Sequence, residues 1–89
     1  MTLERLLNSV GKSTFVKYYY NFKNQTSEYC LNHFEEDYTD KAKATRVSHA
    51  KTIFKNGWEF EALRLIISSN RVDIEIRQKA KQILLENSK

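Results

Sequence analysis

The chain has 89 residues, which suits one domain, and its 40% hydrophobic and 29% charged residues are typical of a folded protein rather than a disordered one. It has no proline and only two glycines, which argues against a hairpin-rich β fold and favours helices joined by short polar links. A formal net charge of +4 favours acidic partners, although many proteins without such partners carry as much, and apolar stretches of only a few residues exclude a membrane span.

Two helices are expected in the first 23 residues. Thr2 is a good cap for a helix over about 3–9, and Gly11 suits its end because a left-handed conformation costs glycine little. Ser13 can cap a second helix over about 14–23. Four aromatic residues recur there at helical spacing and predict one apolar face, and strict alternation, which would indicate a strand, is missing: Phe15, Tyr18, Tyr19 and Phe22.

Four more helices are expected after a polar break at residues 24–27. Their approximate ranges are 29–37, 41–56, 58–68 and 74–87. Thr39 or Asp40 can cap the helix over 41–56, and Gly57 ends it. Asp73 can cap the helix over 74–87. Apolar positions at helical spacing predict one core made of Leu6, Phe15, Tyr19, Phe22, Val47, Ala50, Phe54, Leu63, Ile66, Ile67, Ile76, Ala80 and Ile83.

The sign of the charge reverses in the middle of the chain. Residues 28–40 hold five acids and no base, and residues 41–55 hold five bases and no acid. We expect the acids near residue 40, including Glu35 and Glu36, to favour the positive N-terminal end of the helix that follows them. A helical projection puts Lys41, Lys51 and Lys55 on one shoulder of that helix and Arg46 on the other.

This basic helix suggests two classes of partner, protein or nucleic acid. For nucleic acid, the bases Lys41, Arg46, Lys51 and Lys55 would contact phosphates, Asn56 is a candidate base reader, and Tyr20 is a candidate exposed stacking ring. Docking as a helix-turn-helix is disfavoured, because the helix after Gly57 opens with Glu59 and Glu61, where phosphates would lie.

Other chemistry has little support. The run Gly11-Lys12-Ser13-Thr14 lacks the first glycine and the preceding strand of a phosphate-binding loop. Cys30, His33 and Asp37 share a helical face, but they are too few to hold zinc. The single cysteine cannot form an internal disulfide, and with no signal peptide expected, a reducing cytoplasmic location is predicted.

Residues 50–69 resemble one tetratricopeptide helical hairpin. The resemblance rests on Ala50, Ile53, Gly57, Ala62, Ile66 and Ser69. In that family small residues let two helices approach closely and a glycine-like residue makes the turn. The pattern occurs once in the chain, so the resemblance implies an antiparallel helix pair and, as such pairs are usually scaffolds, a protein-binding role.

Together these features predict an all-α single domain over residues 1–89, a bundle of five or six short helices with an antiparallel hairpin about Gly57. We expect a small non-enzymatic interaction or regulatory protein with a protein partner favoured and nucleic-acid binding by the helix over 41–55 as the alternative. Ile74 and Leu85 lie on a second apolar face of the last helix and are candidate dimer contacts. No cofactor, metal, membrane or small-molecule substrate is expected.

Overall fold

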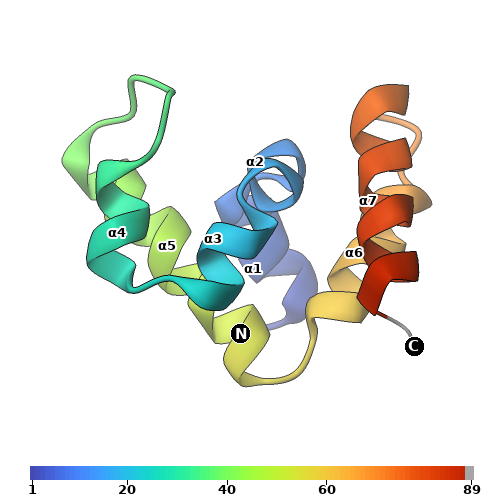
Figure 1. Cartoon of the computed structure of the whole chain (residues 1–89), viewed down its shortest axis with the longest axis horizontal. Coiled ribbons are helices and arrows are strands. Elements are labelled where there is room, and N and C mark those ends of the chain that lie inside the picture. The colour runs from blue at the N-terminus through green and yellow to red at the C-terminus, as the bar shows by residue number, and fades with distance from the viewer. Residues whose placement is uncertain (88–89) are drawn as a thin grey trace.

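The computed structural model describes residues 1–87, and all regular secondary structure within them is α-helical. The helices are α1 (Leu3–Val10), α2 (Lys12–Lys17), α3 (Tyr19–Asn24), α4 (Ser27–Asn32), α5 (Asp40–Lys55), α6 (Glu59–Ile67) and α7 (Ile74–Asn87), as Figure 1 shows. The all-α fold class predicted from the sequence is confirmed. Across residues 1–87 no helix combines the length and the apolar character needed to cross a membrane.

Threonine side chains begin three of the helices. The Thr2 hydroxyl accepts a hydrogen bond from the Arg5 backbone N–H at 3.2 Å, and Thr39 accepts one from the Ala42 N–H at 3.1 Å. Thr26 caps α4 in the same way, through the Tyr29 N–H at 3.1 Å. These bonds satisfy N–H groups that have no partner within the helix, and they confirm the predicted caps at Thr2 and Thr39.

The two glycines end helices, as predicted. Gly57 follows α5 with φ of 72°, and the N–H groups of Gly57 and Trp58 donate to the carbonyls of Phe54 and Ile53 at 3.0 and 2.9 Å, which is a Schellman motif. Gly11 has φ of 91° and ends α1. It also stands directly before α2, which begins at Lys12, so the predicted cap at Ser13 is wrong.

The predicted second helix is divided at Tyr18, which has φ of −110° and ψ of 21°, so residues 1–87 hold seven helices rather than five or six. The division lets the aromatic side chains face two neighbours. Phe15 and Tyr19 contact the Phe54 ring of α5, with centroids 5.7 and 5.1 Å apart. The Tyr18 ring instead packs edge to face on the ring of Phe34, which follows α4, with centroids 5.0 Å apart.

The predicted helix over 29–37 ends early, because α4 stops at Asn32 and residues 33–39 form a connection without helix. Continuing it would have placed Glu35, Glu36 and Asp37 at the negative C-terminal end of a helix, where acids are unfavourable. In the connection, the acids instead reach other parts of the fold.

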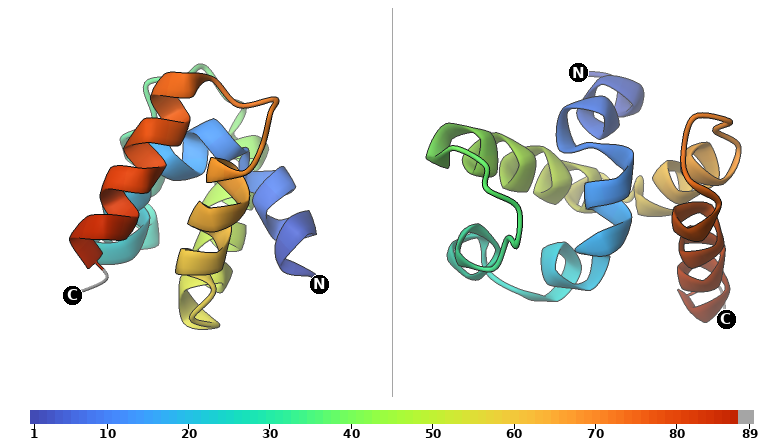
Figure 2. Two further views of the ribbon diagram at one scale, coloured as in Figure 1. Left: turned by 90° about the vertical axis from the view of Figure 1, so that its right-hand side faces the viewer. Right: turned by 90° about the horizontal axis from the view of Figure 1, so that it is seen from above.

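Helix α5 is the centre of the arrangement and lies against α1, α3 and α4, whereas α6 packs mainly against α7 (Figures 1 and 2). Helices α5 and α6 meet at the turn predicted at Gly57 but diverge from it as a V, with few contacts between them. The close antiparallel pairing expected for residues 50–69 is therefore replaced by the packing of α5 on α1 and of α6 on α7.

All expected core residues are buried except Phe54, Ile67 and Ile76, which are partly buried and pack against the core. Further side chains outside the predicted core are also buried, and they are Leu7, Val10, Thr14, Val16, Tyr18, Cys30, Ile53 and Ala62. Several of them lie on helices that touch more than one neighbour, so a single apolar stripe underestimates what these helices bury.

Candidate partner-binding surfaces

Arg46, a predicted partner contact, is turned into the fold. Its Nη1 donates a hydrogen bond to the carbonyl of Val10, in the last turn of α1. Its guanidinium carbon lies 4.0 Å from the centroid of the Tyr38 ring, a cation–π contact. A side chain added at Gly11 would come within 3.1 Å of the same nitrogen. Arg46 therefore holds together α1, α5 and the connection at residues 33–39.

The three lysines of the predicted basic shoulder differ in their surroundings. Lys51 and Lys55 line an open hollow of about 350 Å³ between α4 and α5. The other residues that line it are Ser27, Ser48 and Thr52 and the apolar Leu31, Ala44 and Val47. The Lys51 ammonium donates to the carbonyl of Gln25, next to the end of α3, while Lys55 is exposed. Lys41 is exposed at the start of α5 and lines a separate hollow of about 330 Å³ beside Arg46.

Asn56 and Tyr20 lie apart from this hollow. Asn56 is exposed and is the C-cap residue of α5. Tyr20 is 40% exposed, as predicted for a partner-touching ring, but its hydroxyl accepts a hydrogen bond from the Asn87 amide at 3.1 Å and links α3 to α7.

Ile74 and Leu85, the candidate dimer contacts, are 62% and 65% exposed. They are eleven positions apart on α7, which puts them on one face, but Gln78 and Lys81 occupy that face between them. The two side chains thus form no continuous apolar stripe.

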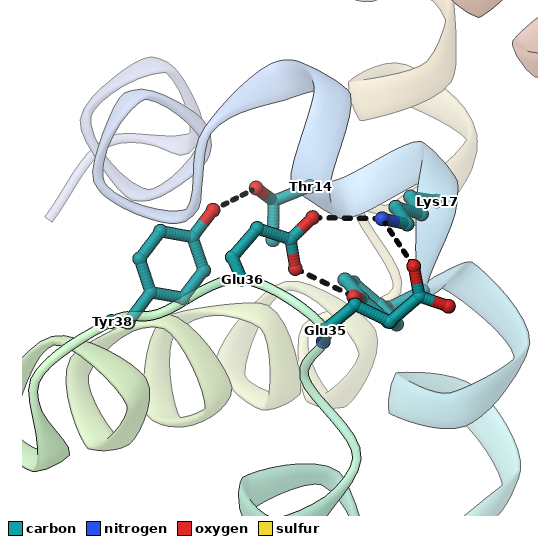
Figure 3. Close-up of polar contacts among 6 residues, drawn as sticks. Thr14, Lys17, Glu35, Glu36 and Tyr38 are labelled. Atoms are coloured by element: carbon teal, nitrogen blue, oxygen red, sulfur yellow. Dashed lines mark hydrogen bonds and ion pairs between the residues drawn. The ribbon is translucent and has the colours of Figure 1, made fainter.

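The acids of the connection bind α2 rather than the start of α5. Lys17 makes ion pairs with Glu36 at 2.8 Å and with Glu35 at 3.1 Å (Figure 3). The Tyr18 hydroxyl donates to Glu36 at 2.6 Å and accepts from the Glu35 backbone N–H at 2.9 Å. Only Asp40 lies in the first turn of α5, so the predicted helix-start role of Glu35 and Glu36 is wrong.

Tyr38 completes this attachment. Its hydroxyl lies 3.1 Å from the Thr14 hydroxyl in a hydrogen bond (Figure 3), and the Arg46 guanidinium lies over its ring. Glu35, Glu36 and Tyr38 therefore fix the connection to α2.

The ion pair between Lys17 and Glu36 shifts the pKa values of both side chains toward their charged forms. Burial raises the pKa of Glu36, but hydrogen bonds from Lys17 and Tyr18 outweigh it and lower the pKa overall. The pKa of Lys17 is raised, chiefly by its hydrogen bond to Glu36. Lys17 is exposed, so solvent and salt screen the pair and its main effect is to position residues 33–39.

Cys30 and His33, considered above as metal ligands, point to different surroundings. Cys30 is buried, and its thiol donates to the Asn21 carbonyl at 3.2 Å. His33 is exposed and stacks on Tyr29, with ring centroids 3.8 Å apart. Within residues 1–87, no three histidine, cysteine or acidic side chains come together in an arrangement that could hold a metal ion.

An extended hollow surface lies between α1 and α6, which run side by side in the left view of Figure 2. It consists of three adjoining hollows of about 380, 350 and 290 Å³, which we call the α1–α6 groove. The first and second share Glu4 and Leu65, and the second and third share Asn8 and Lys12. The groove begins at Thr2 and ends where residues 71–73 precede α7.

The pattern of contacts explains why this groove is open. Helix α1 packs chiefly on α5 and α6 chiefly on α7, so the two helices touch each other only lightly. The α6 wall is a single helical face with spacing i, i+3, i+4, i+7, formed by Glu61, Arg64, Leu65 and Ser68. Sequence reasoning missed it because Leu65 lies outside the buried stripe of its helix, and no local pattern indicates which helix will stand opposite.

Comparison with models of known protein families, with curated proteins and with solved structures finds no match to this chain.

Proposed function

We propose that this protein is a small, non-enzymatic interaction or regulatory protein that binds a protein partner through a helical surface. The observation that carries the proposal is the α1–α6 groove, a run of three hollows with Leu65 at its rim. Leu65 is 37% exposed and lines the first two hollows, so a partner in the groove would cover its apolar surface.

A cytoplasmic location belongs to this proposal. The single Cys30 is a free thiol in the core, and such a residue suits a compartment in which thiols stay reduced.

The proposal is tested by quantitative affinity purification with the wild-type chain and two variants. Leu65→Lys places a charge in the groove, whereas Tyr29→Lys alters an apolar side chain of nearly the same exposure, 38%, on α4. We expect a defined set of partners to be lost with Leu65→Lys and retained with Tyr29→Lys. Equal capture by all three proteins would refute the groove as the binding surface.

Nucleic-acid binding by α5 is the second candidate, and the hollow lined by Lys51 and Lys55 supports it. Lys41 lies on the same side of the helix, and a partner strand could contact these lysines along its backbone. Because Arg46 is engaged within the fold, we expect about two to three phosphate contacts and a shallow salt dependence, with a slope of about −2 to −3 in log K against log salt.

A titration of single-stranded and duplex oligonucleotides at several salt concentrations tests this candidate. The double variant Lys41→Glu with Lys55→Glu should abolish any binding, with Lys79→Glu and Lys81→Glu on α7 as the matched control. Unchanged binding by the α5 variant would dismiss the helix as the contact.

A further inference from the structure

Apolar side chains line the first two hollows of the α1–α6 groove, and charged side chains stand at both of its ends. Leu7 is 1% exposed and lies at the base, Leu65 stands at the rim, and Leu3 is partly buried at the α1 side. A partner segment that fits must therefore present an apolar side to Leu65, between the charged ends of the groove.

The length of the groove limits that segment to a short one. Helix α1 has eight residues, which corresponds to about 12 Å at 1.5 Å per residue, and the third hollow adds roughly one more turn beyond it. A helix of about three turns matches this length, and a groove between two helices is the usual seat of an amphipathic helix that presents residues at i, i+3 or i+4, and i+7.

The charges of the groove differ between its ends. Glu4 and Glu61 line the end at which α1 begins, where Arg64 offsets one of them, and the net charge is negative. Lys12 and Arg71 line the opposite end, where Asp73 offsets one of them, and the net charge is positive. Within residues 1–87 the two salt bridges are those of Lys17 with Glu35 and Glu36. The charged side chains of the groove therefore form no ion pair with another described residue.

This polarity selects a direction for the docked helix. Helices favour acids in the first turn and bases in the last turn, because of their dipole. Such a helix matches the groove when its acidic first turn meets Lys12 and Arg71 and its basic last turn meets Glu4 and Glu61.

We propose that the α1–α6 groove binds a short amphipathic helix of another protein, oriented antiparallel to α1, with its acidic first turn at Lys12 and Arg71. The inference rests on the proposed function and adds to it the chemical character and the direction of the partner segment. A second copy of this chain is the main competing occupant, and the experiment below separates the two.

The probe is a fluorescently labelled, end-blocked peptide of about fourteen residues on an alanine background. It has glutamates in its first turn, leucines at i, i+3 and i+7 in its middle, and lysines in its last turn. Binding to the full chain is followed by fluorescence anisotropy at low salt. We expect saturable binding that is lost with Leu65→Lys and with Ser68→Lys, and retained with Tyr29→Lys, with circular dichroism confirming that each variant is folded.

Direction is tested by pairing peptide and protein variants. Replacing the first-turn glutamates of the peptide with glutamine should weaken binding to the wild-type chain by about threefold, as for exposed charge pairs, and should have no effect on binding to Lys12→Gln with Arg71→Gln. The same peptide change should still weaken binding to Glu4→Gln with Glu61→Gln. The proposed direction is overturned if the first-turn glutamates of the peptide couple to Glu4 and Glu61 instead, or if they couple to neither end of the groove. Either result leaves the protein-binding function intact.

Two further outcomes overturn the proposal itself. Absence of binding by the wild-type chain, or binding that ignores Leu65→Lys and Ser68→Lys, excludes a helix in this groove. Sedimentation velocity that shows a wild-type dimer dissociated by Leu65→Lys identifies a second copy as the occupant.

Discussion

Arg46 joins three parts of the fold that are distant in sequence. Its hydrogen bond satisfies the Val10 carbonyl at the end of α1, and its guanidinium lies against the Tyr38 ring. A surface role for Arg46 was predicted from its place on the polar shoulder of α5, but no helical projection reveals that α1 ends at that point.

Replacing Arg46 should destabilise the fold. Arg46→Ala leaves a carbonyl without its partner and removes the contact with Tyr38, so we expect the free energy of unfolding to fall by about 1–3 kcal/mol in a urea titration. Lys55→Ala, an exposed position on the same helix, should change it by less than about 0.5 kcal/mol. Equal stability of the two variants would contradict this role of Arg46.

Glu36 gives stability a specific dependence on pH. Its pKa in the folded chain is lowered below the ordinary value of 4.5, chiefly by hydrogen bonds from Lys17 and Tyr18, so folding favours the ionised form. This contribution is fully present above pH 4.5 and is lost as the pH falls through the lowered folded pKa. Unfolding free energies measured between pH 7 and pH 3 should therefore fall less steeply for Glu36→Gln than for the wild type.

At the scale of the helices, the turns at the two glycines differ in the space that they leave for a side chain. Gly57 has φ of 72°, and an added Cβ would meet nothing within 4 Å. Gly11 has φ of 91° and ψ of 127°, outside the left-handed helical region, and an added Cβ would lie 3.1 Å from Arg46 Nη1 and 3.4 Å from the Thr14 hydroxyl.

These differences predict unequal costs for the same substitution. Gly57→Ala should destabilise the chain by about 1–2 kcal/mol, the cost of a left-handed conformation alone. Gly11→Ala should cost clearly more, because crowding against Arg46 adds to the backbone strain. Thermal unfolding of the two variants provides the measurement, and a larger effect at Gly57 would show that the α1–α2 joint relaxes easily.

At the scale of the whole molecule, one cluster of buried side chains includes residues from all seven helices described in residues 1–87. Although α6 packs mainly with α7, its residues Ala62, Leu63 and Ile66 belong to the same cluster as those of α1 and α5. This continuity favours cooperative unfolding, as expected for a small domain with a single core.

The single tryptophan, Trp58, tests that cooperativity because it lies at the junction of α5 and α6 and packs partly buried against the core. Its fluorescence and the far-ultraviolet circular dichroism should change at the same urea concentration. Separate transitions would mean that α6 and α7 unfold independently of the remaining helices.

Features that depend on near neighbours were predictable from the amino-acid sequence alone. Absence of proline, helical spacing of apolar residues, threonine caps and the glycines at 11 and 57 act within a turn or two of chain, and they predicted helices close to the observed α1, α5, α6 and α7. Features that depend on distant partners arise from the packing of the helices, and no local pattern reveals them. Tyr18 forms a hydrogen bond with Glu36, which lies in the connection between α4 and α5. Arg46 turns inward because α1 ends beside it. The α1–α6 groove exists because α1 packs on α5 whereas α6 packs on α7.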